Sequence, residues 1–285
     1  MTKPRSAMQP QFVGVTGLPR AGSTLLCQLL AEHPAIACEG HSSPLCNALL
    51  ATRRSISSDP FFLAQLDVQF DLSYAHLQSA LQGFLRGWYA GTDKPLVVDK
   101  NRAWLHCVEY LLQIAPEARL LVCLRDLTQV YGSIEAQHQK TICLDFIDQL
   151  ADFDRLGRAD QLFAKDKIIG APLVSIQALQ DLPQAVRDRV FFVRLEDMLE
   201  RPVQTMASVY RWLGLAEHRF NPERLQLRAH ESDSHFHHKY LHRQYAAVQA
   251  ARSHPVPARV QALIHQACRW YYAWFYPEVL ARTGE

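Results

Sequence analysis

The chain has 285 residues, of which 48% are hydrophobic and 20% are charged, with 12 glycines and 15 prolines. This composition excludes collagen-like, low-complexity and wholly disordered proteins. Thirty basic and 28 acidic side chains give a formal net charge of +2, which is too balanced for a general nucleic-acid binder or a membrane-surface protein. A binding site for an anion must therefore be local.

No apolar segment approaches the ~18 residues that a membrane span requires, and residues 1–11 are polar. We therefore expect a soluble, cytoplasmic protein. The seven cysteines form no CxxC pair and are odd in number, which favours reduced, buried thiols over disulfides or metal ligands. The sequence has no internal repeat and no Gly/Ser-rich linker, so we predict one domain over residues 1–285.

Short apolar runs alternate with segments of helical periodicity along the chain. Residues 12–16 form an apolar, β-branched run, and after a Gly-containing loop four leucines follow at helical spacing up to residue 30. Further apolar runs occupy residues 36–38, 96–98, 120–124 and 190–193, and helical patterns occupy residues 104–114 and 206–213. This order predicts an α/β fold with a P-loop-like parallel sheet and helices on both faces. We expect residues 52–60 and 230–239 to be less ordered loops.

The loop after the first predicted strand has the form of a phosphate-binding loop. Gly17 and Gly22 enclose four residues, and Ser23 and Thr24 open the next helix. Backbone amides at a helix start, together with the helix dipole, attract an anion. A nucleotide triphosphatase would carry lysine where Ser23 stands, so ATP or GTP hydrolysis is disfavoured. Arg20 instead offers a cation within the loop. Glycines needed only for a tight turn are the alternative interpretation.

The loop sequence, Gly-Leu-Pro-Arg-Ala-Gly-Ser-Thr-Leu-Leu, resembles the 5′-phosphosulfate-binding loop of the sulfotransferases. These enzymes use 3′-phosphoadenosine 5′-phosphosulfate (PAPS). The arginine form of the loop is similar to that of the tyrosylprotein sulfotransferases and their bacterial relatives. The resemblance implies the sulfotransferase fold and makes PAPS the co-substrate. It also implies that the 5′ end of PAPS is held by the loop residues Arg20, Ala21, Gly22, Ser23 and Thr24.

Two further segments carry the resemblance. In the family, a strand ending in arginine and a serine eight residues later hold the 3′-phosphate, and here these are Arg125 and Ser133. Open α/β sheets bind ligands at the carboxyl ends of their strands, where Arg125 is expected. Glu196-Asp197 resembles the family's Glu-Asp segment, with a weaker trace at Phe275-Tyr276-Pro277. Taken alone, Arg125 and Asp126 would indicate only an ion pair at a strand end.

The resemblance also implies the catalytic groups. Sulfuryl transfer needs a base for the acceptor hydroxyl and cations for the transferred group. Glu39 follows the same His-Pro turn as the catalytic glutamate of the protein-tyrosine enzymes, and Lys100 matches the family lysine that steadies the sulfuryl group. Arg20 would share that role. Ser232 or Ser234 would add a hydrogen bond to the sulfate, and Lys239 would contact the 3′-phosphate.

The sequence departs from the family pattern at two positions. Leu195 stands where the family has a tyrosine that contacts adenine, and Gln137 stands where the protein-tyrosine enzymes carry a second arginine. Both changes put the strength of PAPS binding in doubt. The histidine-rich stretch at residues 235–238 lacks a second pair of ligands, so we predict no metal site.

The acceptor is the least constrained part of the prediction. The glutamate base and the arginine loop favour a peptide tyrosine near acidic residues, which Arg53, Arg54 and Arg102 would attract. A carbohydrate, a lipid or a phenolic metabolite is the alternative acceptor. A non-catalytic nucleotide-binding module and a P-loop kinase are the rival classes. We expect a bacterial, cytoplasmic enzyme with no nucleic-acid or membrane partner, and the sequence leaves a homodimer open.

Overall fold

The structure, a computed structural model, describes residues 10–141, 150–228, 244–250 and 252–283. Its centre is a parallel sheet in the order β2-β3-β1-β4-β5. The strands are β1 (Gln11–Gly17), β2 (Ile36–Ser42), β3 (Leu96–Lys100), β4 (Arg119–Leu124) and β5 (Val190–Arg194). The five apolar runs that predicted strands all form them, and β2 extends four residues beyond its predicted end. The α/β prediction is therefore confirmed.

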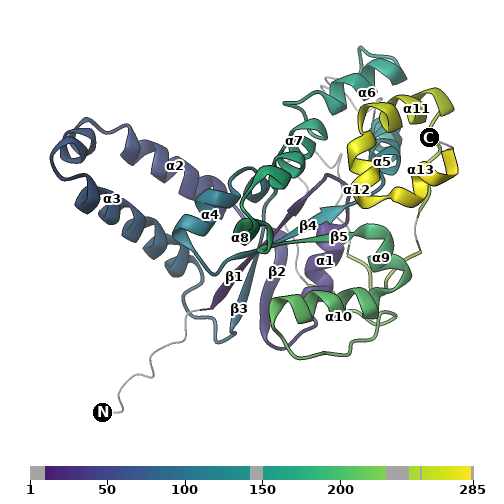
Figure 1. Cartoon of the computed structure of the whole chain (residues 1–285). Coiled ribbons are helices and arrows are strands. Elements are labelled where there is room, and N and C mark those ends of the chain that lie inside the picture. The colour runs from purple at the N-terminus through teal and green to yellow at the C-terminus, as the bar shows by residue number, and fades with distance from the viewer. Residues whose placement is uncertain (1–9, 142–149, 229–243, 251, 284–285) are drawn as a thin grey trace.

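Helices connect these strands and continue to the C-terminal part of the chain (Figure 1). Their bounds are α1 (Ser23–Leu30), α2 (Leu45–Ser57), α3 (Pro60–Trp88), η1 (Arg102–His106), α4 (Val108–Ile114), α5 (Leu127–Thr141), α6 (Arg155–Phe163), α7 (Gly170–Ala178), η2 (Leu179–Asp181), α8 (Gln184–Arg187), α9 (Leu195–Glu200), α10 (Pro202–Leu213), α11 (Ala258–Ala267), α12 (Arg269–Phe275) and α13 (Pro277–Thr283). Among the described residues, none of these helices has both the length and the apolar character needed to cross a bilayer.

The two faces of the sheet are covered by different helices, because successive residues of a strand point to opposite sides. On one face, the Phe12 ring meets the ring of Trp104 from η1 at 5.2 Å, edge to face. Gly14 lies beneath the same indole. On the other face α1 packs on the sheet. Helix α10 is joined to α1 by a 3.2 Å hydrogen bond from the Tyr210 hydroxyl to the Leu29 carbonyl. Burial on both faces explains the uninterrupted apolar strands.

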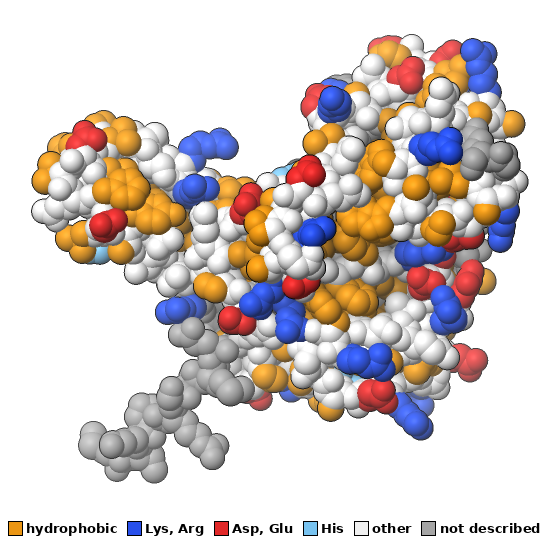
Figure 2. Space-filling view, viewed as in Figure 1, with side chains coloured by type: hydrophobic (Ala, Val, Ile, Leu, Met, Phe, Trp, Pro, Cys, Tyr) orange, Lys and Arg blue, Asp and Glu red, His pale blue; other side chains and the backbone are white. Residues whose placement is uncertain are grey.

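An arm made of α2 and α3 projects from the body of the molecule (Figure 1). The expectation of a loop over residues 52–60 is wrong for residues 52–57, which form the last turns of α2. Asp59 then starts α3 by accepting hydrogen bonds from two backbone amides, with Pro60 at the first helical position. Helix α3 kinks at Gln69. Apolar side chains are exposed along this arm (Figure 2).

Candidate functional site

The loop between β1 and α1 is fixed by close backbone approaches. Gly17 has a φ of 125°, and a Cβ there would lie 2.2 Å from the Cys123 carbonyl oxygen of β4. Arg20 has a φ of 59°, a left-handed conformation that is uncommon outside glycine and often found at functional sites. Gly22 also has a positive φ and precedes α1, whose first turn has no side-chain cap. The α1 amides are therefore free to face an anion.

Arg20 and Arg125 meet at the edge of the sheet where β1 and β4 end. The Arg20 Nε donates to the Ser133 hydroxyl at 3.2 Å, and the Arg125 Nη1 donates to the Arg20 carbonyl at 3.0 Å. Ser133 is buried in α5, and burial lowers the pKa of Arg125. The structure thus brings together the loop and the two residues of the second motif. In this arrangement the Arg20 side chain is directed towards Ser133 on α5.

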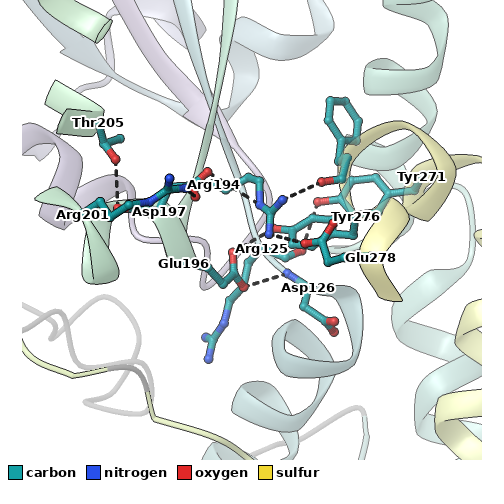
Figure 3. A network of polar contacts seen from close by, with 11 residues as sticks. Arg125, Asp126, Arg194, Glu196, Asp197, Arg201, Thr205, Tyr271, Tyr276 and Glu278 are labelled. Atoms are coloured by element: carbon teal, nitrogen blue, oxygen red, sulfur yellow. Dashed lines mark hydrogen bonds and ion pairs between the residues drawn. The ribbon is translucent and has the colours of Figure 1, made fainter. Parts of the chain in front are cut away.

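A network of polar contacts holds the segment after β4 in place (Figure 3). Glu196 accepts a 3.1 Å bond from the Asp126 amide and a 2.9 Å bond from the Tyr276 hydroxyl. The Tyr271 hydroxyl donates to the Arg125 carbonyl at 3.0 Å, and Arg194 lies 4.2 Å over the Tyr276 ring. The Glu-Asp segment and the faint C-terminal trace of the resemblance therefore converge behind Arg125. They position its backbone.

Sequence reasoning missed a further segment that reaches this site, the one that contains Arg252 and His254. The Arg252 carbonyl accepts from Arg125 Nη2 at 3.4 Å, and the His254 amide donates to Gln129 at 2.8 Å. Gly132 permits this contact, because a Cβ there would lie 2.7 Å from the His254 Cβ. Burial lowers the pKa of His254, and the charges of Arg125, Arg20, Lys140 and Arg252 lower it further. No local motif marks this segment, which tertiary contacts bring to α5.

Lys100 lies at the end of β3, next to the loop. Its ammonium group donates to the Thr24 hydroxyl at 3.5 Å, and the residue is buried. The neighbouring Asp99 points elsewhere, accepting from the Trp104 indole at 2.6 Å and from the Tyr89 hydroxyl at 2.7 Å. Burial, followed by the Asp99 charge, raises the pKa of Tyr89. Asp99 is thus engaged by two uncharged donors, and Lys100 is directed towards α1.

Glu39 lies in β2, where the register with β3 shifts between Cys38 and Ser42. Its carboxylate is 2.8 Å from the His41 Nε2, and its side chain is 79% exposed. His41 was not singled out from the sequence, although it stands two residues after Glu39. Both residues and Lys100 line one cavity of about 240 Å³, together with Ala37, Cys38, Gly40, Ser43, Pro44, Trp88, Tyr89, Ala90, Thr92, Val98 and Asp99. The cavity therefore holds an accessible base beside a cation.

The remaining residues that the sequence marked are the three other predicted site residues and the two departures from the family pattern. Ser232, Ser234 and Lys239 lie outside the described residues, as do the histidines at 235–238. Leu195, at the start of α9, packs against Gly22, where a Cβ would lie 2.6 Å from the Leu195 side chain. Gln137 lies on α5, one turn after Ser133. Within the described part of the chain, no group of three or more His, Cys, Asp or Glu side chains could hold a metal ion.

Curated relatives resemble part of the chain. "Protein-tyrosine sulfotransferase 2" of Gallus gallus is 24% identical over 214 residues, which is 74% of this chain and 53% of that protein. "Protein-tyrosine sulfotransferase 1" of Mus musculus is 31% identical over 117 residues, or 40% of this chain and 30% of that protein. The chain thus spans about half the length of the first relative and about a third of the length of the second.

Solved structures with a similar fold include the "Sulfotransferase Domain from the Curacin Biosynthetic Pathway", at 15% identity, with a TM-score of 0.49 over 90% of this chain and 97% of that one. The sulfotransferase from Alicyclobacillus acidocaldarius is 14% identical, with a TM-score of 0.48 over 74% of this chain and 83% of that one. The model of the sulfotransferase family matches residues 11–219, which contain the loop, Glu39, Lys100, Arg125 and Ser133. The chain belongs to the sulfotransferase family.

Proposed function

We propose that this chain transfers the sulfuryl group of PAPS to the hydroxyl of a peptide tyrosine that lies near acidic residues. The observation that carries the proposal is the juxtaposition of an anion site and a base. Arg20, Arg125 and Ser133 meet where β1 and β4 end, and Lys100 links the adjacent end of β3 to α1. Glu39 lines the same cavity as Lys100.

The residues present fit a nucleotide donor that carries phosphate groups at the 5′ and 3′ positions of its ribose. The α1 amides, Lys100 and Thr24 would hold the 5′ end, because they surround the loop. Arg125 and Ser133 would hold the 3′-phosphate, with the segment that contains Arg252 and His254 close by. PAPS supplies a sulfuryl group attached to a phosphate that can leave.

The chain's own residues would then position the reactants and move one proton. Glu39 would take the proton of the acceptor hydroxyl, which is otherwise a weak nucleophile because a phenol ionises at about pH 10. Lys100 would neutralise negative charge on the transferred group and on the leaving oxygen, whereas Arg20, which contacts Ser133, would neutralise charge on the 3′-phosphate side. His41 would orient the Glu39 carboxylate through their 2.8 Å contact. No metal ion is needed for these roles.

A peptide tyrosine is favoured by the similarity to protein-tyrosine sulfotransferases and by the exposure of the base. Glu39 is open to solvent, so an acceptor carried on a larger molecule can reach it. Arg53 and Arg54 are exposed on α2, at the base of which the cavity begins, and they would attract acidic flanking residues. A carbohydrate, lipid or phenolic metabolite is the second candidate, because the same base would serve any hydroxyl.

The donor site is tested by calorimetric titration with 3′,5′-bisphosphoadenosine, with ATP as the comparison. We expect preferential binding of the bisphosphate. Preference for ATP with phosphorylation of an acceptor would indicate a P-loop kinase. Tight bisphosphate binding without transfer to any acceptor would indicate a non-catalytic module.

The acceptor is tested by incubating the protein with labelled PAPS and a matched panel. The panel contains acidic tyrosine peptides, the same peptides with phenylalanine in place of tyrosine, neutral tyrosine peptides, small phenols and glycans. We expect label only in peptides with tyrosine, and most in the acidic ones. Labelling restricted to phenols or glycans would contradict the tyrosine proposal and leave sulfuryl transfer intact.

A further inference from the structure

Two cysteines from different elements lie in contact at the base of the arm. The Sγ atoms of Cys46, in the first turn of α2, and Cys107, between η1 and α4, are 3.6 Å apart. Sulfur atoms in a disulfide are about 2.05 Å apart, so a small side-chain movement would join them. The residues are 61 positions apart in the sequence, which is why their spacing gave no hint of a pair.

The two thiols differ in exposure and in the direction of their pKa shifts. The hydrogen bond between the two thiols lowers the pKa of Cys107, whereas that bond and burial raise the pKa of Cys46. Cys46 is fully buried and Cys107 is half-buried. Cys107 is thus both the more accessible thiol and the one with the lowered pKa. Because the thiolate is the nucleophile, we expect Cys107 to react first. Such a pair has an attacking and a resolving member.

Tyr110 lies close to the pair. It interacts electrostatically with both thiols, and Arg53 stacks over its ring at 4.7 Å. The Tyr110 hydroxyl is buried and has no hydrogen-bond partner among the described residues. Cys268, by contrast, is buried without a neighbouring thiol in the described structure, and burial raises its pKa to about 11. A reactive thiol is therefore expected at Cys107 and not at Cys268.

We propose that Cys46 and Cys107 form a redox modification site, at which a hydroperoxide oxidises the pair to a disulfide that joins α2 to the η1–α4 segment. The Cys107 thiolate attacks one peroxide oxygen, the O–O bond breaks, and Cys107 becomes a sulfenic acid as hydroxide leaves and is protonated to water. The Cys46 sulfur then attacks the Cys107 sulfur, the S–O bond breaks, and the Cys46 proton leaves with the second water. Two thiols thus lose two electrons to one hydrogen peroxide.

The disulfide would act next to the candidate site. Ser43, three residues before Cys46, donates its amide to the Lys100 carbonyl at 3.0 Å and accepts from the Asn101 side chain at 2.6 Å. Ser43 also lines the cavity that holds Glu39 and Lys100. The disulfide would therefore fasten the start of α2, and with it the cavity wall that contains Ser43, to the η1–α4 segment.

The test is peptide mapping of the reduced full-length protein after treatment with equimolar hydrogen peroxide and alkylation of the remaining thiols. Digestion with trypsin and a glutamate-specific protease isolates Cys46 in residues 40–53 and Cys107 in residues 103–109, each free of other cysteines. We expect these two peptides to be cross-linked and to separate on reduction with dithiothreitol. Alkylation of both thiols after peroxide, or a cross-link between Cys27 and Cys38 in their place, would overturn the proposal.

Variants test the order of attack. Cys46→Ser should leave a sulfenic acid on Cys107 that dimedone traps, whereas Cys107→Ser should leave Cys46 alkylated and unoxidised. The Cys268→Ser control should cross-link as the wild type does, and circular dichroism checks that each variant is folded. Sulfenic acid on Cys46 in the Cys107→Ser protein would reverse the assignment. Because wild-type mapping measures thiols and not transfer, its outcome is independent of the proposed function.

Discussion

The two halves of the candidate site are built differently. On the proposed nucleotide side, Arg20 of the loop donates to Ser133, Arg125 donates to the Arg20 carbonyl, and Tyr271 of α12 donates to the Arg125 carbonyl. On the acceptor side, Glu39 contacts His41, and most of its side chain is in solvent. A preorganised cation site binds an anion without paying for its own ordering, whereas an open carboxylate can serve acceptors of different shape. Under the proposed function, this difference predicts that the donor is recognised more strictly than the acceptor.

The largest effect is expected from Lys100→Met, which removes the cation between the two halves and keeps a side chain of similar length. Loss of one charge-stabilising group costs about 10²–10³ in turnover. Steady-state transfer from PAPS measures the change. Lys167, an exposed lysine paired with Asp166, supplies the control Lys167→Met. A Lys100→Met enzyme with wild-type turnover would remove Lys100 from the chemistry.

Glu39→Gln tests the acceptor half alone. The amide cannot take a proton, so we expect turnover to fall by at least about 10²-fold, the scale for a positioned base. Bisphosphate affinity should stay at the wild-type value, because the donor residues are untouched. Glu109→Gln, at an exposed position of α4, is the control. Equal turnover of Glu39→Gln and wild type would assign the base elsewhere.

Arg125→Ala tests the donor half. We expect bisphosphate affinity to fall by about 2–3 kcal/mol, since a charge-assisted contact to phosphate is lost. This corresponds to about 30- to 150-fold in Kd by calorimetry. Arg187→Ala, at an exposed site on α8, should bind as the wild type does. If the two variants bind equally, Arg125 does not hold the 3′-phosphate.

The smallest effect concerns pH. The pKa of His254 is lowered, first by burial and then by neighbouring cations. A bound 3′-phosphate would raise it, so binding takes up a proton at a pH between the two values. Affinity should therefore rise as the pH falls through the pKa of His254 in the complex towards its lower pKa in the free protein, by at most about tenfold per unit. Protonation of phosphate itself opposes this trend below about pH 6.

Proton uptake is measured by titrating bisphosphate in two buffers of different ionisation enthalpy at one pH. The His254→Gln protein should show no uptake. The control His76→Gln should keep the wild-type uptake, because His76 lies in α3 on the arm and not next to Arg125. Identical uptake by His254→Gln and wild type would show that another group titrates.

The strands were predictable because each is buried on both faces and appears as a continuous apolar run. The arm was not. Residues 52–57 contain two arginines and two serines with few apolar side chains, a composition that suggests a loop. In the structure α2 buries only Leu45, Cys46 and Leu49 at its start, so its outer turns carry no apolar period. Helix formation there depends on packing against α3.

The candidate site was predictable where its residues follow strand ends. The loop, Lys100 and Arg125 each stand directly after an apolar run, and parallel strands bring such positions to one edge. His41 and His254 carry no such signal. His254 reaches the site only because Gly132 and Gln129 admit its backbone, 125 residues away from Gln129. The Cys46–Cys107 contact is likewise a product of folding.

Strand order has a consequence for how such a protein can change over evolution. β1 and β4, which are followed by Arg20 and Arg125, lie inside the sheet, whereas β2, which contains Glu39, lies at its edge among the described strands. The register of β2 already shifts around Gly40, whose φ is 85°. Insertions or deletions there would disturb a single strand pairing. Under the proposed function, new acceptors would therefore arise by alterations in β2 and the arm, while the residues proposed to bind the donor keep their geometry.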